Sequence, residues 1–219
     1  IPANAFTSSR LKEIELPSTL TSIGEYAFYL SGLLEDPVLP EGITSIGGSA
    51  FRGCASLEYP MLPEGLKTIG NFAFSDCTGM IGLAWTEGVT TIGNNAFAGC
   101  TALEAADLPD SVTTIGYRAF QNCTALSSFR YPLNWTTAYR YYDSGIFEGC
   151  TALTSVTVPE GVTSIPANAF TASSLTDIDL PASLRTIGSY AFYNCTKIQE
   201  IDLPIDLTTL GNNAFKGCS

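Results

Sequence analysis

A phenylalanine that returns every 22 or 23 residues is the feature that most limits what this chain can fold into. Eight of the nine steps between its occurrences have that length, and the step that ends at Phe147 has 27 residues. The ten positions are Phe6, Phe28, Phe51, Phe74, Phe97, Phe120, Phe147, Phe170, Phe192 and Phe215. A fixed period of this length is typical of a chain built from stacked structural repeats.

The recurring unit reads L-x-x-I-x-L-P-x-x-V-T-x-I-G-x-x-A-F-x-x-C-T-x, and its first part has the pattern of a strand. In the copy at 103–108, Leu103, Ala106 and Leu108 would face inward while Ala105 and Asp107 would face solvent, which is the alternation of a half-buried strand. Proline follows this segment in eight of nine units and would end the pairing, because it has no backbone N–H.

Repeats of about 20 to 29 residues with an L-x-x-L-x-L core are typical of leucine-rich repeats. We therefore predict a single leucine-rich repeat array over 1–219, coiled right-handedly, with nine complete strand units and partial units at both ends. One parallel β-sheet is expected on the concave side, and short turns or 3-10 segments on the convex side. The glycine after the repeat isoleucine predicts a turn that needs a positive φ or a close approach. Buried lines are expected along the repeat phenylalanines and along Leu16, Leu39, Leu62, Leu108, Val158, Leu180 and Leu203.

The combination of L-P, S-I-G, A-F and C-T resembles BspA-type leucine-rich repeat proteins, the kind found on surfaces of mucosal and gut bacteria. The resemblance covers essentially the whole chain. It implies display outside the cell and a role in adhesion or host interaction, and it implies no catalytic residues, because the family shares none. The sequence departs from the pattern in the insertion before Phe147 and in the cysteine missing after Phe6, Phe28 and Phe170.

The composition excludes several kinds of partner. A net charge of −11 and a pI near 4.3 disfavour nucleic acid and anionic lipid surfaces. No apolar run approaches the roughly 18 residues that a membrane helix needs. The N-terminus lacks the layout of a signal peptide, and the chain opens in mid-unit, so we expect an excised or mature segment whose signal and anchor lie outside it.

Seven cysteines each follow a repeat phenylalanine by three residues. Their spacing is the repeat period and not a C-x-x-C pair, which disfavours zinc. Side chains stacked in register would hold the Cβ atoms farther apart than disulfide geometry prefers. A buried, reduced ladder is therefore the favoured interpretation, with disulfides or a metal as the alternatives.

The chain has no histidine, so Ser-His and Cys-His nucleophiles are excluded. Acidic residues at outward strand positions would lie on an open, solvated face, where nothing raises a carboxyl pKa for acid catalysis. We therefore predict no catalytic residue, no cofactor and no metal site. A weak Ca²⁺ site formed by Asp177, Asp179, Glu200 and Asp202 is the alternative to a purely solubilising role.

The insertion, at about 132–146, is the one non-repetitive feature. It concentrates tyrosine, tryptophan and arginine, the residue types enriched at binding hot spots. The predicted binding residues are Trp135, Tyr139, Arg140, Tyr141 and Tyr142, assisted by Arg130 and Tyr59. The alternative is that the extra rings only seal an enlarged loop.

These observations favour a non-catalytic module at the bacterial cell surface that binds a host protein or glycan through the concave face and the insertion. A monomer is expected. A structural spacer, or a segment that associates with itself, is the first alternative, and a carbohydrate-active enzyme is the least favoured.

Overall fold

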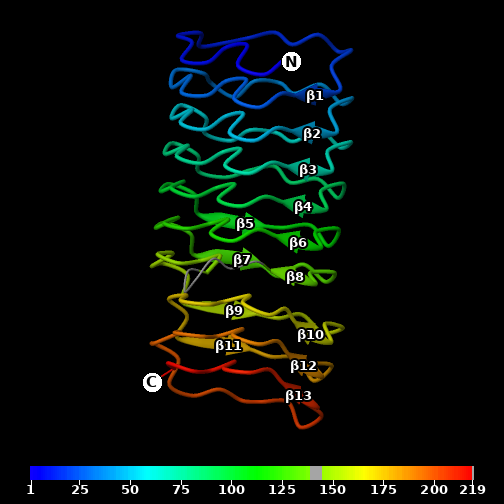
Figure 1. The fold of residues 1–219 in the computed structure, drawn as a ribbon, viewed down its shortest axis with the longest axis vertical. Helices are drawn as coiled ribbons and strands as arrows, with labels where there is room; N and C mark the ends of the chain where they lie inside the picture. The colour runs from blue at the N-terminus through cyan, green and yellow to red at the C-terminus, as the bar shows by residue number, and fades with distance from the viewer. Residues whose placement is uncertain (139–144, 219) are drawn as a thin grey trace.

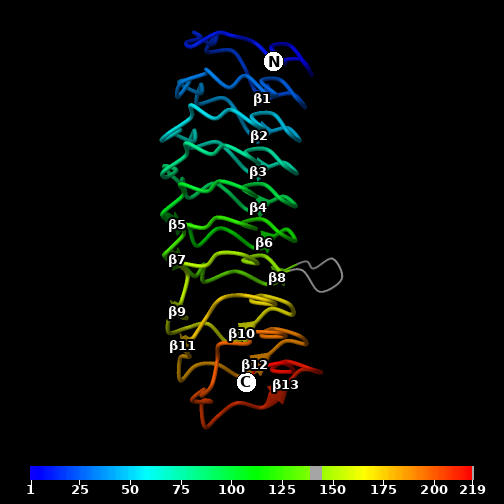
Figure 2. The same cartoon turned by 90° about the vertical axis from the view of Figure 1, so that its left-hand side faces the viewer.

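The computed structural model describes residues 1–138 and 145–218 and is a column of stacked turns. Figure 1 shows the N-terminus at one end of the column and the C-terminus at the other. The described residues form strands and turns but no helix, and neighbouring units pair 22 or 23 residues apart. The predicted leucine-rich repeat solenoid is therefore confirmed. The column runs almost straight in both views, so its strand faces are close to flat (Figures 1 and 2).

Most strand pairing lies at the Ser-Ile or Thr-Ile segment of each unit, which we call the isoleucine ladder. A six-stranded parallel sheet contains β1 (Ser22–Ile23), β2 (Ser45–Ile46), β3 (Thr68–Ile69), β4 (Thr91–Ile92), β6 (Thr114–Ile115) and β8 (Thr137–Ala138). A separate three-stranded sheet continues the stack with β10 (Ser164–Ile165), β12 (Thr186–Ile187) and β13 (Thr209–Leu210). The sequence pattern predicts the strand in the L-x-x-I-x-L segment and not here, although a β-branched pair favours strand structure.

The strand predicted from the L-x-x-I-x-L segment is shorter than expected and forms two separate pairs, which we call the leucine ladder. The pairs are β5 (Ala105–Asp107) with β7 (Ser128–Arg130), and β9 (Ser155–Thr157) with β11 (Asp177–Asp179). Prolines at the middle of this segment in two early units, Pro37 and Pro60, remove a ladder N–H there. The Asp36 carboxylate instead accepts hydrogen bonds from the N–H groups of Glu58 (3.0 Å) and Tyr59 (2.9 Å).

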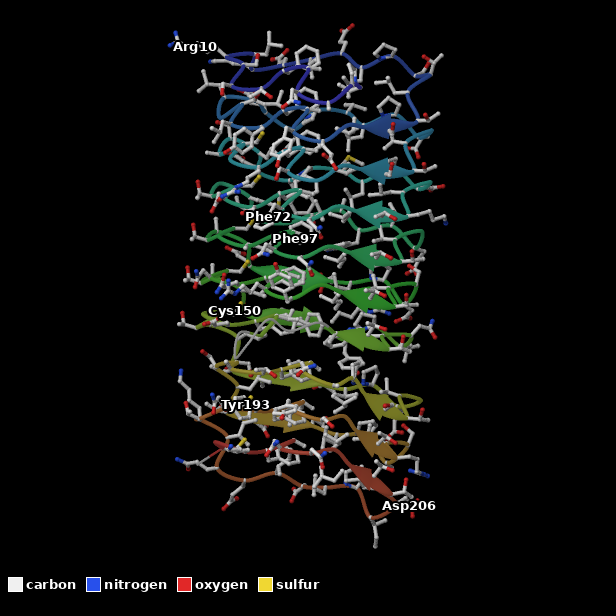
Figure 3. All side chains as sticks on the ribbon, in the orientation of Figure 1. Arg10, Phe72, Phe97, Cys150, Tyr193 and Asp206 are labelled. Atoms are coloured by element: carbon white, nitrogen blue, oxygen red, sulfur yellow. The ribbon has the colours of Figure 1, made fainter. Side chains whose placement is uncertain are left out.

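The core is organised around the repeat phenylalanines. All ten rings stack in order along the column, with centroids 5.1–5.8 Å apart and ring planes within 17° of parallel. The eight inner rings, from Phe28 to Phe192, are buried, and Phe97 is marked among the side chains in Figure 3. The predicted phenylalanine line is confirmed.

The predicted line of strand-end residues is confirmed only in the middle of the column. Leu39, Leu62, Leu108 and Val158 are buried. Leu16 and Leu180 are partly exposed, and Leu203 is 44% exposed, because it lies in the last turn, where no unit packs against its outer side.

The repeat glycines are required by close approach and not by a positive φ. A Cβ atom on Gly47 would lie 2.7 Å from the Glu25 nitrogen of the preceding unit, closer than real Cβ contacts come. Positive φ occurs instead two residues before and two residues after the repeat phenylalanine, as at Asn95 (54°) and Gly99 (77°) around Phe97. These two left-handed residues turn the chain around the ring.

Candidate functional site

Three core positions in the unit that contains β7 and β8 hold large aromatic side chains. Phe129, Tyr131 and Trp135 are 7%, 2% and 2% exposed. In the preceding unit the same positions hold smaller residues, since Ala106 pairs with Phe129 and the equivalents of the other two are Leu108 and Val112. This unit therefore carries much more side-chain volume in its core than its neighbours.

The extra volume reaches into the next unit. The Trp135 ring lies 5.9 Å from the Phe170 ring, centroid to centroid, and the Tyr131 ring lies 6.4 Å from it. The two longest steps of the phenylalanine stack, 5.7 and 5.8 Å, lie on either side of Phe147, whereas the other steps are 5.4 Å or less. The aromatic cluster of Phe129, Tyr131 and Trp135 thus fills a widened space between the two units.

Two neighbouring units meet at an interface that we call the junction. The first unit contains β7, β8 and Phe147, and the second contains β9, β10 and Phe170. Both ladders stop there: β8 does not pair with β10, and β7 does not pair with β9. On one side of the junction the Thr136 N–H donates to the Thr113 oxygen (3.1 Å), and on the other the Arg185 N–H donates to the Thr163 oxygen (2.9 Å). Within the described part of the chain, no equivalent hydrogen bond joins Thr163 to Thr136.

The turns around the phenylalanines show the same interruption. The Phe120 N–H donates to the Ile146 oxygen (3.0 Å), and the Phe170 N–H donates to the Ala191 oxygen (2.7 Å). Between these units, both of which are described at these positions, the corresponding bond from Phe147 to Ala169 is missing. Ring contacts therefore take over from backbone hydrogen bonds at the junction.

A cleft of about 510 Å³ opens at the junction on the leucine ladder. Figure 2 places β7 and β9 next to each other on one side of the column. Most residues that line the cleft come from β7, β9 and the segments next to them, and Asp110 comes from the turn after β5. The lining residues are Asp110, Ser127, Ser128, Phe129, Arg130, Tyr131, Leu133, Ser155, Val156, Thr157, Pro159 and Glu160.

Arg130, one of the predicted binding residues, lies at the rim of this cleft with its side chain about half exposed. Its guanidinium donates to the Asp110 carboxylate (2.9 Å) and to the Leu108 oxygen (2.5 Å). The Leu133 N–H also donates to Asp110 (3.1 Å), and this hydrogen bond, together with Arg130, lowers the pKa of that carboxyl group. Arg130 is thus held in a fixed place by a charge partner.

The prediction that Trp135 contacts a ligand at the surface is wrong. Its ring is buried, and its Nε1–H donates to the Thr137 oxygen (2.9 Å). Trp135 stands at the valine position of the repeat unit, three residues after Pro132, so the sequence carried a signal for burial. The interpretation that the rings only seal the core holds for this residue.

The insertion is also narrower than predicted. Regular unit positions continue to Ala138, the second residue of β8, and resume by Ile146 next to Phe147, so the four extra residues fall within 139–144 and not across 132–146. Tyr139, Arg140, Tyr141 and Tyr142 lie outside the described residues. Tyr59 is 56% exposed but lies three units from Arg130, and the structure does not bring the two side chains together.

The cysteines form the predicted reduced and mostly buried column. All seven thiols are free, and only Cys218 is partly exposed. Each thiol donates to the backbone oxygen of the repeat phenylalanine one unit earlier, at Sγ–O distances of 2.9–3.3 Å. Burial raises the pKa of Cys54 and Cys100 to about 12 and that of Cys195 to about 11. A raised pKa and burial together make a thiol a poor nucleophile.

Serine stands at each of the three positions where the cysteine is missing, namely Ser9, Ser31 and Ser173. The Ser31 hydroxyl donates to the Phe6 oxygen (2.6 Å), which is the bond that cysteine makes elsewhere. At the junction the pattern changes, because the Ser173 hydroxyl lies 3.3 Å from the Cys195 sulfur. The serine at each of these positions is the signal in the sequence for the hydroxyl that replaces the thiol.

The repeat pattern of this chain matches that of a known protein family. The model of the BspA type leucine rich repeat region, in six copies, matches residues 1–127 and 126–219. The chain belongs to this BspA-type leucine-rich repeat family. The two matched segments meet in the unit that precedes the junction.

Three solved structures are similar to this BspA-type chain. The T. pallidum leucine-rich repeat protein has a TM-score of 0.66 at 27% identity, over 86% of this chain and 78% of its own. A leucine-rich repeat protein from Eubacterium ventriosum has a TM-score of 0.61 at 26% identity, over 99% and 67%. One from Bacteroides ovatus has a TM-score of 0.61 at 20% identity, over 99% and 72%, and shows the fold alone. The comparison with curated proteins gives no match.

Residues 1–138 and 145–218 contain no group of three or more His, Cys, Asp or Glu side chains that could hold a metal ion. The same residues contain no helix long and apolar enough to cross a membrane.

Proposed function

We propose that this array is a non-catalytic interaction module, displayed on a bacterial cell surface, that binds a host protein or glycan through the exposed side of the leucine ladder. The observation that carries the proposal is the junction cleft with Arg130 at its rim. At the junction both ladders are interrupted, so the described surface departs there from the repeated pattern. A specific ligand needs such a departure to fix its position along the column.

Two further considerations support the proposal. The likeness to BspA-type proteins favours display outside the cell. The exposed Tyr59 and the sequence from Tyr139 to Tyr142 supply aromatic residues of the kind enriched at binding hot spots, and we propose that they extend the contact beyond the cleft. We expect the chain to act as a monomer.

The proposal is tested by measuring binding of the whole chain to an array of immobilised matrix proteins and glycans. For a ligand found in this way, Arg130→Ala should weaken binding, by at least about fivefold if Arg130 contributes about 1 kcal/mol. Arg52→Ala is the matched control, because Arg52 is another exposed arginine paired with an aspartate, Asp76 at 3.2 Å. Equal effects of the two substitutions, or no ligand on the array, would contradict the proposal and favour a spacer that only projects other parts of a larger protein.

A further inference from the structure

The two walls of the junction cleft present backbone groups that are paired in the units directly before and directly after the junction. The Ser127 N–H donates to the Glu104 oxygen (2.9 Å), and the Thr176 N–H donates to the Thr154 oxygen (2.8 Å). No such bond runs from the Thr154 N–H to the Ser127 oxygen, both of which are described. The facing edges of β7 and β9 therefore offer donors and acceptors to a ligand, as an open strand edge does.

The side chains around these edges are rich in hydroxyl groups and nearly balanced in charge. Ser128, Ser155 and Thr157 are exposed on the walls. Arg130 is neutralised by Asp110, and the Glu160 carboxylate already accepts a hydrogen bond from the Ala182 N–H (3.0 Å). An anionic ligand would thus find one cation that is already paired and two carboxylates nearby, which disfavours its binding.

We propose that the junction cleft binds an uncharged sugar residue of a glycan, whose hydroxyl groups bridge the unpaired edges of β7 and β9. A hydroxyl group both donates and accepts hydrogen bonds, which matches walls that offer unpaired N–H and C=O groups together with hydroxyl side chains. The cleft volume lies in the range of small-ligand sites, about 300–1,000 Å³. This inference rests on the proposed function and narrows its ligand to a neutral glycan at one place.

A sugar bound in this way restores a hydrogen-bonded connection across the junction. Amide hydrogens at Thr154 to Thr157 should then exchange more slowly in the complex, because opening of β9 away from β7 requires the ligand to leave. A ligand bound anywhere else on the column would not protect these amides selectively.

The probes are neutral hexasaccharides (cellohexaose, maltohexaose, chitohexaose and mannohexaose), with a heparin hexasaccharide as the anionic comparison, tested by titration calorimetry and amide hydrogen exchange. We expect at least one neutral probe to bind and to slow exchange at Thr154 to Thr157. Thr157→Trp and Ser128→Trp, one on each wall, should fill the cleft and lower its affinity at least about tenfold. Met61→Trp is the control, because Met61 is exposed at the same unit position as Thr157 but lies outside the cleft.

Each remaining outcome separates this inference from the proposed function. The inference would be overturned if a neutral probe bound and neither Thr157→Trp nor Ser128→Trp weakened its binding, with both variants melting like the wild type. The sugar would then bind elsewhere. Preference for heparin, or binding of a protein ligand without any sugar, would also overturn it and would leave the interaction module intact. Failure of every glycan and every matrix protein to bind would reject both proposals.

Discussion

At the residue scale, the cysteine side chain connects consecutive units through a single hydrogen bond. Its thiol donates to the oxygen of the phenylalanine one unit earlier, as Cys100 does to Phe74 at 3.1 Å. Ser31 makes the equivalent bond to Phe6, so a hydroxyl group fits the same place. The position therefore requires a small side chain that can donate, and thiol chemistry is not required.

The free energy of unfolding should decrease above pH 9 because of these thiols. The pKa of Cys100 is about 12 in the folded state and near 9 when the chain is unfolded, so above pH 9 the unfolded chain loses a proton that the folded chain keeps. The stabilisation is complete below pH 9 and is lost as the pH rises toward 12, at about 1.4 kcal/mol per pH unit for each such thiol. Urea unfolding at pH 8, 9 and 10 measures the slope.

Cys100→Ser is the matched variant for this measurement, because serine keeps the donor and does not titrate in this range. The slope of the variant should be smaller by one proton, while the other thiols, tyrosines and lysines contribute equally to both proteins. Identical slopes in the two proteins would contradict the assigned pKa. A free energy of unfolding that increases from pH 8 to pH 10 would contradict the burial of the column.

At the scale of elements, the aromatic cluster of Phe129, Tyr131 and Trp135 increases the spacing of the units at the junction and also packs against both of them. Its rings contact Phe147 and Phe170 on either side of the junction, with Phe129 and Phe147 centroids 4.7 Å apart. Aromatic pairs at such distances stabilise by about 0.5–1.5 kcal/mol beyond the area that they bury. The cluster therefore connects the two units at the junction through ring contacts, where a ladder is interrupted.

Trp135→Ala should lower the free energy of unfolding by about 3–5 kcal/mol, the range for emptying a core aromatic position. Leu133→Ala, two residues away and 44% exposed at the surface, should change it by less than about 0.5 kcal/mol. Thermal and urea unfolding of both variants measure the difference. A Trp135 variant that melts like the wild type would show that the ring does not support the junction.

The sequence predicts the elements of this fold where the period repeats and misjudges them where a unit departs from it. The phenylalanine line and the thiol column follow from strict spacing, and the structure confirms both. The enrichment of tryptophan in binding sites predicts Trp135 at the surface, although its place in the unit is that of a valine. The interruption of both ladders could not be predicted, because it depends on how three large rings share one space.

At the scale of the whole molecule, the junction divides a one-dimensional stack. In such a stack the stability is the sum of unit terms and nearest-neighbour terms, so one weak interface limits cooperativity. The described units before the junction are joined by the six-stranded isoleucine ladder, and those after it by the three-stranded one. The column should therefore behave as two cooperative blocks.

Native-state hydrogen exchange at increasing urea should resolve these blocks. Amides of β10 and β12 should exchange at a lower opening free energy than those of β2, β3 and β4, because the shorter block has fewer neighbouring units to stabilise it. Trp135→Ala should enlarge the gap between the two groups. Exchange of both groups in one global event, in the wild type and in the variant, would contradict a division at the junction.

The repetition of contacts also determines how an array of this kind can change length over generations. Most units present the same backbone groups to the unit on either side, and the hexapeptide I-P-A-N-A-F occurs identically at 1–6 and 165–170. Gain or loss of one such unit by unequal recombination would leave every remaining neighbour with a compatible surface. The unit with Phe129 and Trp135 is different, because a second copy would have to place its rings against another unit of equal bulk. Selection on array length should therefore tolerate changes on either side of this unit more readily than duplication of the unit itself.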